Sequence, residues 1–87
     1  MQKPRPAVVI SPDEMNNRLN TVLVAPLTRR GFVAPFRVPC QFAGVTGQIA
    51  LDHVRSVDKR RLALRLGQLD PATAKTMLTT LRELFEE

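Results

Sequence analysis

The side chains best suited to chemistry on a phosphate backbone are the cationic ones in the middle of the chain. An Arg guanidinium presents a planar fork of donors that matches phosphate oxygens. Not all of these cations can face one groove, because Arg60 and Arg61 are neighbours on an extended or turning segment. Residues 28–31 are expected to form a basic loop. Phe32 and Phe36 flank this loop and could stack unpaired bases, although such residues are more often core or edge aromatics. The cations that could track a polyanion are Arg29, Arg30, Arg37, Arg55, Lys59, Arg60, Arg61 and Arg65.

Two further reactive side chains occur once each. Histidine is the side chain whose charge changes nearest to neutral pH, and His53 is the only one. If its strand runs without a bulge, His53 shares a face with Leu51 and Ile49, which favours a packed or edge histidine. The alternative is that His53 contacts a base or transfers a proton. Cys40 is the only cysteine, so an intrachain disulfide is excluded and a reducing compartment is favoured.

One Cys and one His cannot complete a zinc site, so we predict neither a metal nor a cofactor. The start of the chain has no apolar core long enough for a signal peptide. The longest apolar run, residues 22–27, contains Pro26 and is too short to span a bilayer. We therefore expect a cytoplasmic protein that does not bind membranes.

Charge is distributed unevenly along the chain, whose formal net charge is +5. Eleven Lys or Arg oppose four Asp or Glu up to Leu66, whereas two oppose four from Gly67 onward. A basic body with an acidic end suits a polyanionic ligand, although solubility alone could also explain it. Eighty-seven residues form one domain, residues 1–87, with a core of modest stability.

Short β-branched and alternating runs predict a mainly β fold. Residues 12–20 are expected to form a loop or one helical turn, and Gly44 and Gly47 are expected to bracket a turn. Pro26 and Pro39 are expected to end the strands that precede them. The alternation of Leu with Ala and Arg in the last expected strand gives it one wet, basic face. The expected strands cover residues 7–10, 21–25, 36–38, 48–57 and 62–66.

The end of the chain predicts an amphipathic helix that closes the core against an antiparallel sheet. Asp70 is a good N-cap, and Pro71 occupies the first helical position, where its missing N–H costs nothing. One apolar stripe follows at helical spacing and consists of Met77, Leu78, Leu81, Leu84 and Phe85.

Several of these segments resemble the MazF/PemK family of toxin–antitoxin ribonucleases. Residues 5–12, Arg-Pro followed by aliphatic residues and Ser-Pro, look like the Arg-Pro strand entry of the family. Residues 52–62 look like its second signature, an acidic residue and a Gln followed by a basic segment, with His53 in place of the usual Gln. Residues 24–28 are similar to the strand end that carries the family's Thr. Residues 67–84 resemble the last part of the family's chain, a strand and a turn followed by a terminal helix.

The resemblance implies a small SH3-like antiparallel barrel of the CcdB/MazF type with a C-terminal helix. It also implies a homodimer that cleaves single-stranded RNA at specific sequences without a metal. A cognate acidic antitoxin would neutralise it by occupying the RNA groove. Arg5 matches the family's catalytic Arg and Thr28 its catalytic Thr. The expected RNA-binding residues are Arg29, Arg30, Arg37, His53 and Arg55.

The chain also departs from the family pattern at its start. Family members carry a further strand and a Glu-Gln loop before the Arg-Pro pair, whereas four residues precede Arg5 here. We therefore expect that strand, loop and carboxylate to be absent and the activity to be reduced. One alternative is a relative that binds RNA or antitoxin without cutting. Another is a CcdB-like toxin that inhibits a topoisomerase, which would not need the Arg5 and Thr28 pair.

Overall fold

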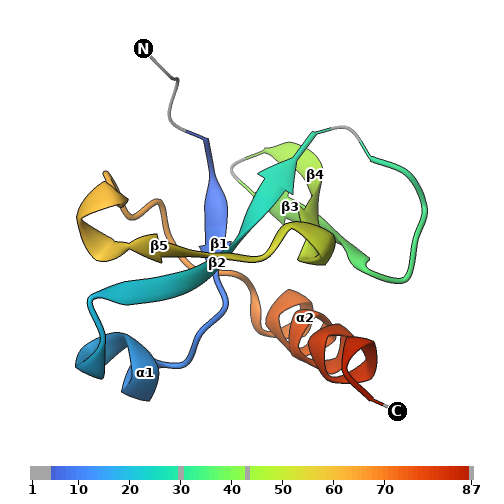
Figure 1. Cartoon of the computed structure of the whole chain (residues 1–87). Coiled ribbons are helices and arrows are strands. Elements are labelled where there is room, and N and C mark those ends of the chain that lie inside the picture. The colour runs from blue at the N-terminus through green and yellow to red at the C-terminus, as the bar shows by residue number, and fades with distance from the viewer. Residues whose placement is uncertain (1–4, 30, 43, 87) are drawn as a thin grey trace.

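A computed structural model describes residues 5–29, 31–42 and 44–86. In this range the chain forms a curled antiparallel half-barrel that a C-terminal helix covers (Figure 1). The expected mainly β fold with a C-terminal helix is confirmed. The elements are β1 (Ala7–Val9), α1 (Asp13–Arg18), β2 (Thr21–Thr28), β3 (Arg37–Phe42), β4 (Val45–Ala50), the 3-10 turn η1 (Leu51–His53), β5 (Arg55–Asp58), the 3-10 turn η2 (Lys59–Arg61) and α2 (Pro71–Leu84).

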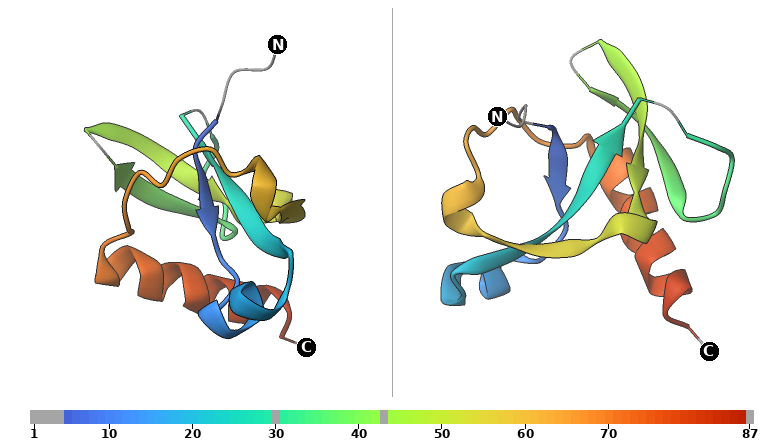
Figure 2. Two further views of the ribbon diagram at one scale, coloured as in Figure 1. Left: turned by 90° about the vertical axis from the view of Figure 1, so that its left-hand side faces the viewer. Right: turned by 45° about the horizontal axis from the view of Figure 1, so that its top comes forward.

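Strand β2 organises the sheet because three other strands pair with it. β1 lies along one edge, with Ala7 opposite Pro26 and Val9 opposite Val24. On the other edge, β5 pairs with the first half of β2 and β4 pairs with its last two residues, Leu27 and Thr28. β4 also pairs with β3, so the sheet curls from β1 to β3 around the core (Figure 2).

The expected single strand over residues 48–57 is wrong, because η1 interrupts it. Ile49 of β4 lies opposite Leu27, whereas Arg55 of β5 lies opposite Val24. Six steps along the chain, from Ile49 to Arg55, therefore correspond to only three steps along β2, from Leu27 to Val24. The three extra residues leave the ladder and form η1. Leu51 consequently turns into the core, while Asp52 and His53 project outward.

Two expected strand ends are also wrong, since β2 continues past Pro26 and β3 continues past Pro39. The amide of Leu27 donates to the carbonyl of Pro6, so the missing N–H of Pro26 would face the β5 edge. At that edge the pairing with β5 has already ended at Val24, and no ladder bond is lost. Pro39 lies in the strand at the end of the sheet order, which also tolerates proline.

The glycine turn is only partly as expected. Gly44 lies at the turn between β3 and β4 with φ of 77°, a left-handed conformation that favours glycine. Gly47 lies inside β4 instead. A Cβ there would be 2.5 Å from the Thr28 carbonyl oxygen, so glycine allows β4 to approach the end of β2.

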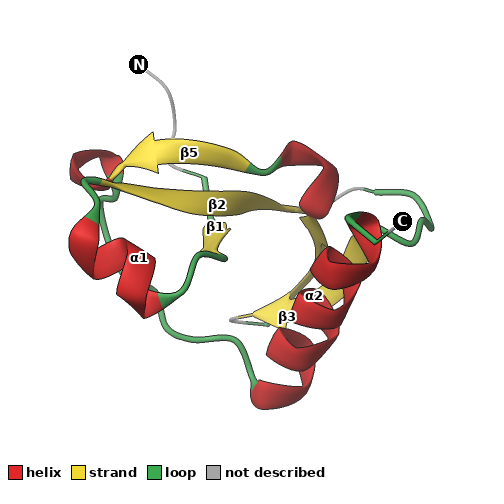
Figure 3. Cartoon of the chain, turned by 60° about the horizontal axis from the view of Figure 1, so that its bottom comes forward, coloured by secondary structure: helices red, strands yellow, loops and turns green. Residues whose placement is uncertain are grey.

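Helix α1 confirms the helical alternative for residues 12–20. Ser11 is buried where the chain enters this segment, and its hydroxyl donates to Asn16 Oδ1 at 2.5 Å. The Ser11 Oγ atom in turn accepts a hydrogen bond from the amide of Leu23 at 3.0 Å. These bonds attach α1 to β2 at the end of the molecule away from α2 (Figure 3).

The core lies between the inner face of the half-barrel and α2. Its buried side chains come from β2, β3, β4, η1 and α2, and Ile49 is the largest that is fully buried. Val22 and Val24 are also buried but belong to the outer face of β2. The buried cluster consists of Ala25, Val38, Cys40, Ile49, Leu51 and Met77.

Helix α2 begins as expected and packs against β3. Asp70 accepts from the Thr73 amide at 3.1 Å and from its hydroxyl at 2.6 Å, and Pro71 begins the helix. The predicted apolar stripe is only partly buried. Met77 and Leu81 pack on the core, whereas Leu78, Leu84 and Phe85 are exposed.

The expected strand over residues 62–66 is wrong. The segment between η2 and α2 contains no strand, and Leu62, Leu64 and Leu66 are 47%, 78% and 61% exposed. An alternating sequence forms a strand only where a neighbouring edge offers hydrogen bonds, and this segment pairs with no strand in the described part of the chain.

Candidate active site

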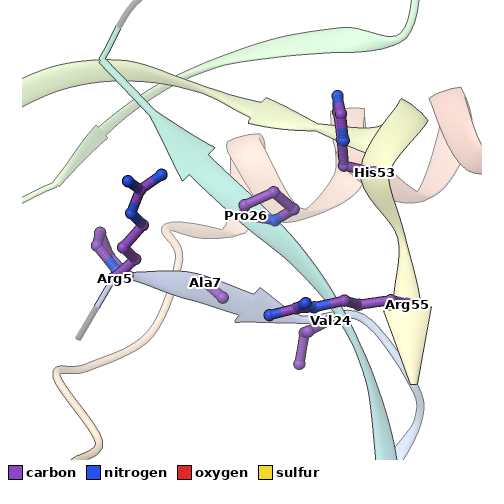
Figure 4. Close-up of a pocket in the computed structure, with 7 residues that line it drawn as sticks. Arg5, Ala7, Val24, Pro26, His53 and Arg55 are labelled. Atoms are coloured by element: carbon purple, nitrogen blue, oxygen red, sulfur yellow. The ribbon is translucent and has the colours of Figure 1, made fainter. Parts of the chain in front are cut away.

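A groove of about 260 Å³ lies on the outer face of the sheet, where β1, β2 and β5 run side by side. Its floor is apolar and comes from Ala7, Val24 and Pro26, while its polar groups are basic or titratable. Figure 4 shows the side chains of Arg5 and His53 extending to the same side of the sheet, with Pro26 between them. The residues that line the groove are Arg5, Pro6, Ala7, Val24, Pro26, His53 and Arg55.

Arg5 and Thr28, the pair expected to be catalytic, come from neighbouring strand positions. Ala7 lies opposite Pro26, and the bond from the Leu27 amide to the Pro6 carbonyl extends this register outward. Arg5 precedes β1, so this register, continued beyond the last bond, directs Arg5 toward the Thr28 end of β2. The antiparallel pairing therefore brings the segment of Arg5 alongside the end of β2, which is far from it in sequence.

Thr28 lies two positions beyond Pro26 on the groove face of β2, and its partner across β4 is Gln48. Both side chains carry a buried oxygen, Thr28 Oγ1 and Gln48 Oε1, without a hydrogen-bond partner among the described residues. The amide of Gln48 donates to the Phe32 carbonyl at 3.2 Å. The loop after β2 therefore folds back onto β4. The Thr28 hydroxyl remains uncommitted to any described structural bond.

His53 lies beside an ion pair that joins η1 to β3. Arg37 donates to both oxygens of Asp52, at 2.7 and 2.9 Å, and its side chain is only 9% exposed. The Asp52 Oδ2 atom is 3.2 Å from His53 Nε2, and the His53 side chain is 63% exposed. His53 is therefore an exposed groove residue, not a histidine packed on the face of Leu51 and Ile49.

The pKa of the Asp52 carboxyl lies below its usual range, chiefly because of the hydrogen bonds from Arg37. The charges of Arg37 and His53 add smaller effects. Asp52 is therefore a carboxylate at neutral pH. Arg37 also stacks on Phe32, with its guanidinium carbon 4.6 Å from the ring centroid. Phe32 meets Phe36 edge-on, with ring centroids 6.0 Å apart.

The remaining basic residues divide into groups with and without protein partners. Arg55 lines the groove, and Arg29 is exposed directly after Thr28. Arg30 lies outside the described residues. Arg60 pairs with Asp58 at 3.0 Å, and Lys59 Nζ donates to the Asn16 carbonyl. Both cations therefore have partners within the protein, and both line a second pocket, separate from the groove.

Sequence reasoning missed the roles of Asp52 and Gln48. Asp52 lies fifteen residues from Arg37, and its pairing depends on the turn η1, which the hydrophobic pattern did not predict. Gln48 was assigned to a long strand with no indication that it faces Thr28. In both cases the missing information was the register of β4 on β2 and β3.

Cys40 is buried, and this burial raises the pKa of its thiol, with a further contribution from the charge of Asp70. Among the described residues, no group of three or more His, Cys, Asp or Glu side chains could bind a metal ion. No helix in that part of the chain is long and apolar enough to cross a membrane.

Comparisons with known proteins agree with this geometry. Residues 1–85 match the family of PemK-like, MazF-like toxins of type II toxin–antitoxin systems. The crystal structure of a MazE–MazF complex from Deinococcus radiodurans is similar with 33% identity and a TM-score of 0.79. That match covers 92% of this chain and 80% of that one. Among curated protein sequences, no match to this chain is found.

Two further structures match over most of their length. A mycobacterial endoribonuclease in complex with its cognate antitoxin has 25% identity and a TM-score of 0.83, over 91% of this chain and 78% of that one. A toxin from Mtb has 18% identity and a TM-score of 0.84, over 93% and 92%, and shows the fold alone. The half-barrel with its basic outer groove is thus the fold of MazF toxins. The chain belongs to the PemK/MazF toxin family of type II toxin–antitoxin systems.

Proposed function

We propose that this chain is a toxin that cleaves single-stranded RNA at specific sequences without a metal ion. The observation that supports the proposal most is the register of β1 on β2, which directs Arg5, a residue of the basic groove, toward the Thr28 end of β2. The endoribonuclease among the similar structures supports the same reaction.

The chemistry requires little from the protein, because RNA carries its own nucleophile. The ribose 2′-oxygen attacks the adjacent phosphorus, the bond to the 5′-oxygen breaks, and a 2′,3′-cyclic phosphate and a 5′-hydroxyl result. The charge that develops on the phosphorane needs donors fixed in place. Arg5 supplies a guanidinium for these oxygens, and Thr28 supplies a hydroxyl that no described protein group occupies. Arg5 is not a general base, since a guanidinium does not lose its proton in proteins.

The RNA backbone would follow the cations of the groove. Arg55 and His53 line it beside β5, and Arg29 extends it past Thr28. Arg30 belongs to the same expected set. Arg37 was expected to bind RNA directly, but its guanidinium is occupied by Asp52 and stacks on Phe32. Its contribution is therefore to position Asp52 and the residues beside it.

Two partners follow from the same proposal. An acidic antitoxin segment would compete with RNA for the groove, since both present negative charge to Arg5 and Arg55. Two of the similar structures are complexes with an antitoxin, MazE in one of them. A second copy of the chain would form a homodimer and supplement a small core.

The test is cleavage of a long single-stranded RNA by the purified protein in EDTA. We expect cleavage at a small number of sites, and we expect Arg5→Ala and Thr28→Ala each to remove most of it. Arg18→Ala is the matched control, because Arg18 is an exposed arginine on α1 whose one ion pair with a described residue is with Glu14. Circular dichroism checks that each variant is folded. A requirement for a divalent metal, or cleavage that survives both substitutions, would exclude the proposal.

A further inference from the structure

His53 occupies the side of the groove opposite Arg5. Pro26 lies between them on β2, and neither Pro26 nor its neighbour Val24 carries a titratable group. Strands in a sheet are about 4.8 Å apart, so the backbones of β1 and β5 are separated by roughly 10 Å. An Arg and a His side chain that extend to the same side from these positions can contact different oxygens of one phosphodiester.

Asp52, which lies beside His53, is itself fixed in position. Both oxygens of Asp52 accept from Arg37, whose side chain is buried between Asp52 and the Phe32 ring. The carboxylate therefore has one defined location, 3.2 Å from His53 Nε2, from which it can orient the imidazole in the groove.

The charges that face His53 come from four elements. Asp52 of η1 is negative, whereas Arg5 before β1 and Arg55 of β5 are positive. Arg37 of β3 is neutralised by its bidentate bond to Asp52. A bound phosphodiester adds one negative charge between Arg5 and His53. Substrate binding thus offsets the two arginine charges beside His53.

We propose that His53 is the general acid of the cleavage reaction and that Asp52 is its positioning residue. This inference rests on the proposed function. The 2′-hydroxyl gives its proton to water as its oxygen bonds to phosphorus. The bond from phosphorus to the 5′-oxygen breaks, and the leaving oxygen takes its proton from the His53 imidazolium. Solvent then reprotonates the imidazole. Arg5 stabilises the phosphorane and transfers no proton.

A leaving group that needs no proton provides the decisive test. After the cleaved linkage is mapped with the natural protein, an oligonucleotide is prepared with sulfur in place of the 5′-bridging oxygen at that linkage. Sulfur leaves as a stable thiolate, so an acid contributes little to its departure. Single-turnover rates are then compared for the natural protein, His53→Gln, Asp52→Asn and the control Arg18→Ala.

We expect His53→Gln to slow cleavage of ordinary RNA by about 10²–10⁴-fold, the usual contribution of a positioned acid. On the sulfur substrate, the same variant should cleave nearly as fast as the natural protein. Asp52→Asn should lower the cleavage rate of ordinary RNA by a smaller factor. This loss of rate should also be relieved on the sulfur substrate. It should also change the pH profile of the rate, which a purely structural role would not do.

The outcomes separate this inference from the function on which it rests. Equal losses on both substrates, or no loss in His53→Gln while Arg5→Ala abolishes cleavage, would overturn the role of His53 and leave the ribonuclease intact. A natural protein that binds RNA but cuts neither substrate would overturn both. Arg18→Ala must cleave like the natural protein in every series.

Discussion

Thr28 and Gln48 face each other across β2 and β4, and each carries a buried side-chain oxygen without a hydrogen-bond partner in the described part of the chain. A hydroxyl can donate to an amide oxygen, so one bond between these two side chains would satisfy both atoms. The alternative partner for the hydroxyl is a phosphate oxygen. The geometry at the end of β2 is therefore important for both stability and function.

Gly47→Ala should disturb Thr28 through the backbone. The added Cβ would lie 2.5 Å from the Thr28 carbonyl oxygen, so β4 must move away from the end of β2. We expect a loss of about 1–3 kcal/mol in the free energy of unfolding, which is usual for overpacking. Because Thr28 moves with its carbonyl, RNA cleavage should also fall. Urea denaturation and a cleavage assay measure the two effects.

The contrast for this variant is Gly44→Ala in the neighbouring turn. There an added Cβ meets no atom within 4 Å, and the cost comes only from the positive φ of 77°. This variant should lose stability but cleave RNA at the natural rate once folded. If Gly47→Ala also keeps the natural rate, the close approach of β4 does not position Thr28.

The ion pair of Arg37 and Asp52 should make stability depend on pH in the acid range. In the folded state the Arg37 guanidinium lowers the pKa of the Asp52 carboxyl below its unfolded value of about 3.9. A lowered folded-state pKa stabilises the protein above the unfolded pKa, and this stabilisation is lost as the pH falls through the folded pKa. The melting temperature should therefore decrease below about pH 4.

Asp52→Asn should remove part of this dependence. The variant should melt at a lower temperature than the natural protein at neutral pH and converge with it as the pH falls through the lowered pKa of Asp52. Asp58 and Asp70 keep some acid dependence in both proteins, because their pKa values are also lowered, by Arg60 and Thr73. Asp13→Asn is the control, since Asp13 makes no side-chain bond among the described residues. Parallel melting curves for the natural protein and Asp52→Asn would contradict the assignment.

The sequence predicted the class of fold and the start of α2, because these depend on local signals. The β-branched runs form β1 and β2, and Asp70 with Pro71 begins the last helix as expected. Arg5 and Thr28 could be found only through the family resemblance. Nothing in their local sequence shows that β1 pairs with β2, or in which register.

The errors have one physical origin, since local patterns do not contain strand register. η1 forms because β4 and β5 pair with β2 in registers that differ by three residues, and no apolar periodicity reports this. Pro26 is compatible with a strand because its nitrogen faces an edge where pairing has ended. Leu62, Leu64 and Leu66 alternate like a strand but pair with none in the described chain.

These three leucines give a prediction about the proposed homodimer. A second copy that buries them would supplement a core of only nine apolar residues in the described part of the chain. We expect light scattering at micromolar concentration to give twice the chain mass of 9.7 kDa. Leu64→Glu should shift the protein toward the monomer, whereas Gln68→Glu, an exposed control in the same segment, should not. A folded monomer whose melting temperature is independent of concentration would argue against the dimer.

The proposed function requires that RNA bound in this groove is cleaved by attack of its own 2′-hydroxyl. The most direct measurement uses an RNA oligonucleotide that spans a mapped cleavage site, together with a copy that lacks only the 2′-hydroxyl at that position. Both are incubated with the natural protein in EDTA, and the ends of the products are identified. We predict that the RNA yields a 2′,3′-cyclic phosphate and a 5′-hydroxyl, and that the deoxy copy is bound but not cut. Cleavage of the deoxy copy, or a product with a 5′-phosphate, would contradict the account.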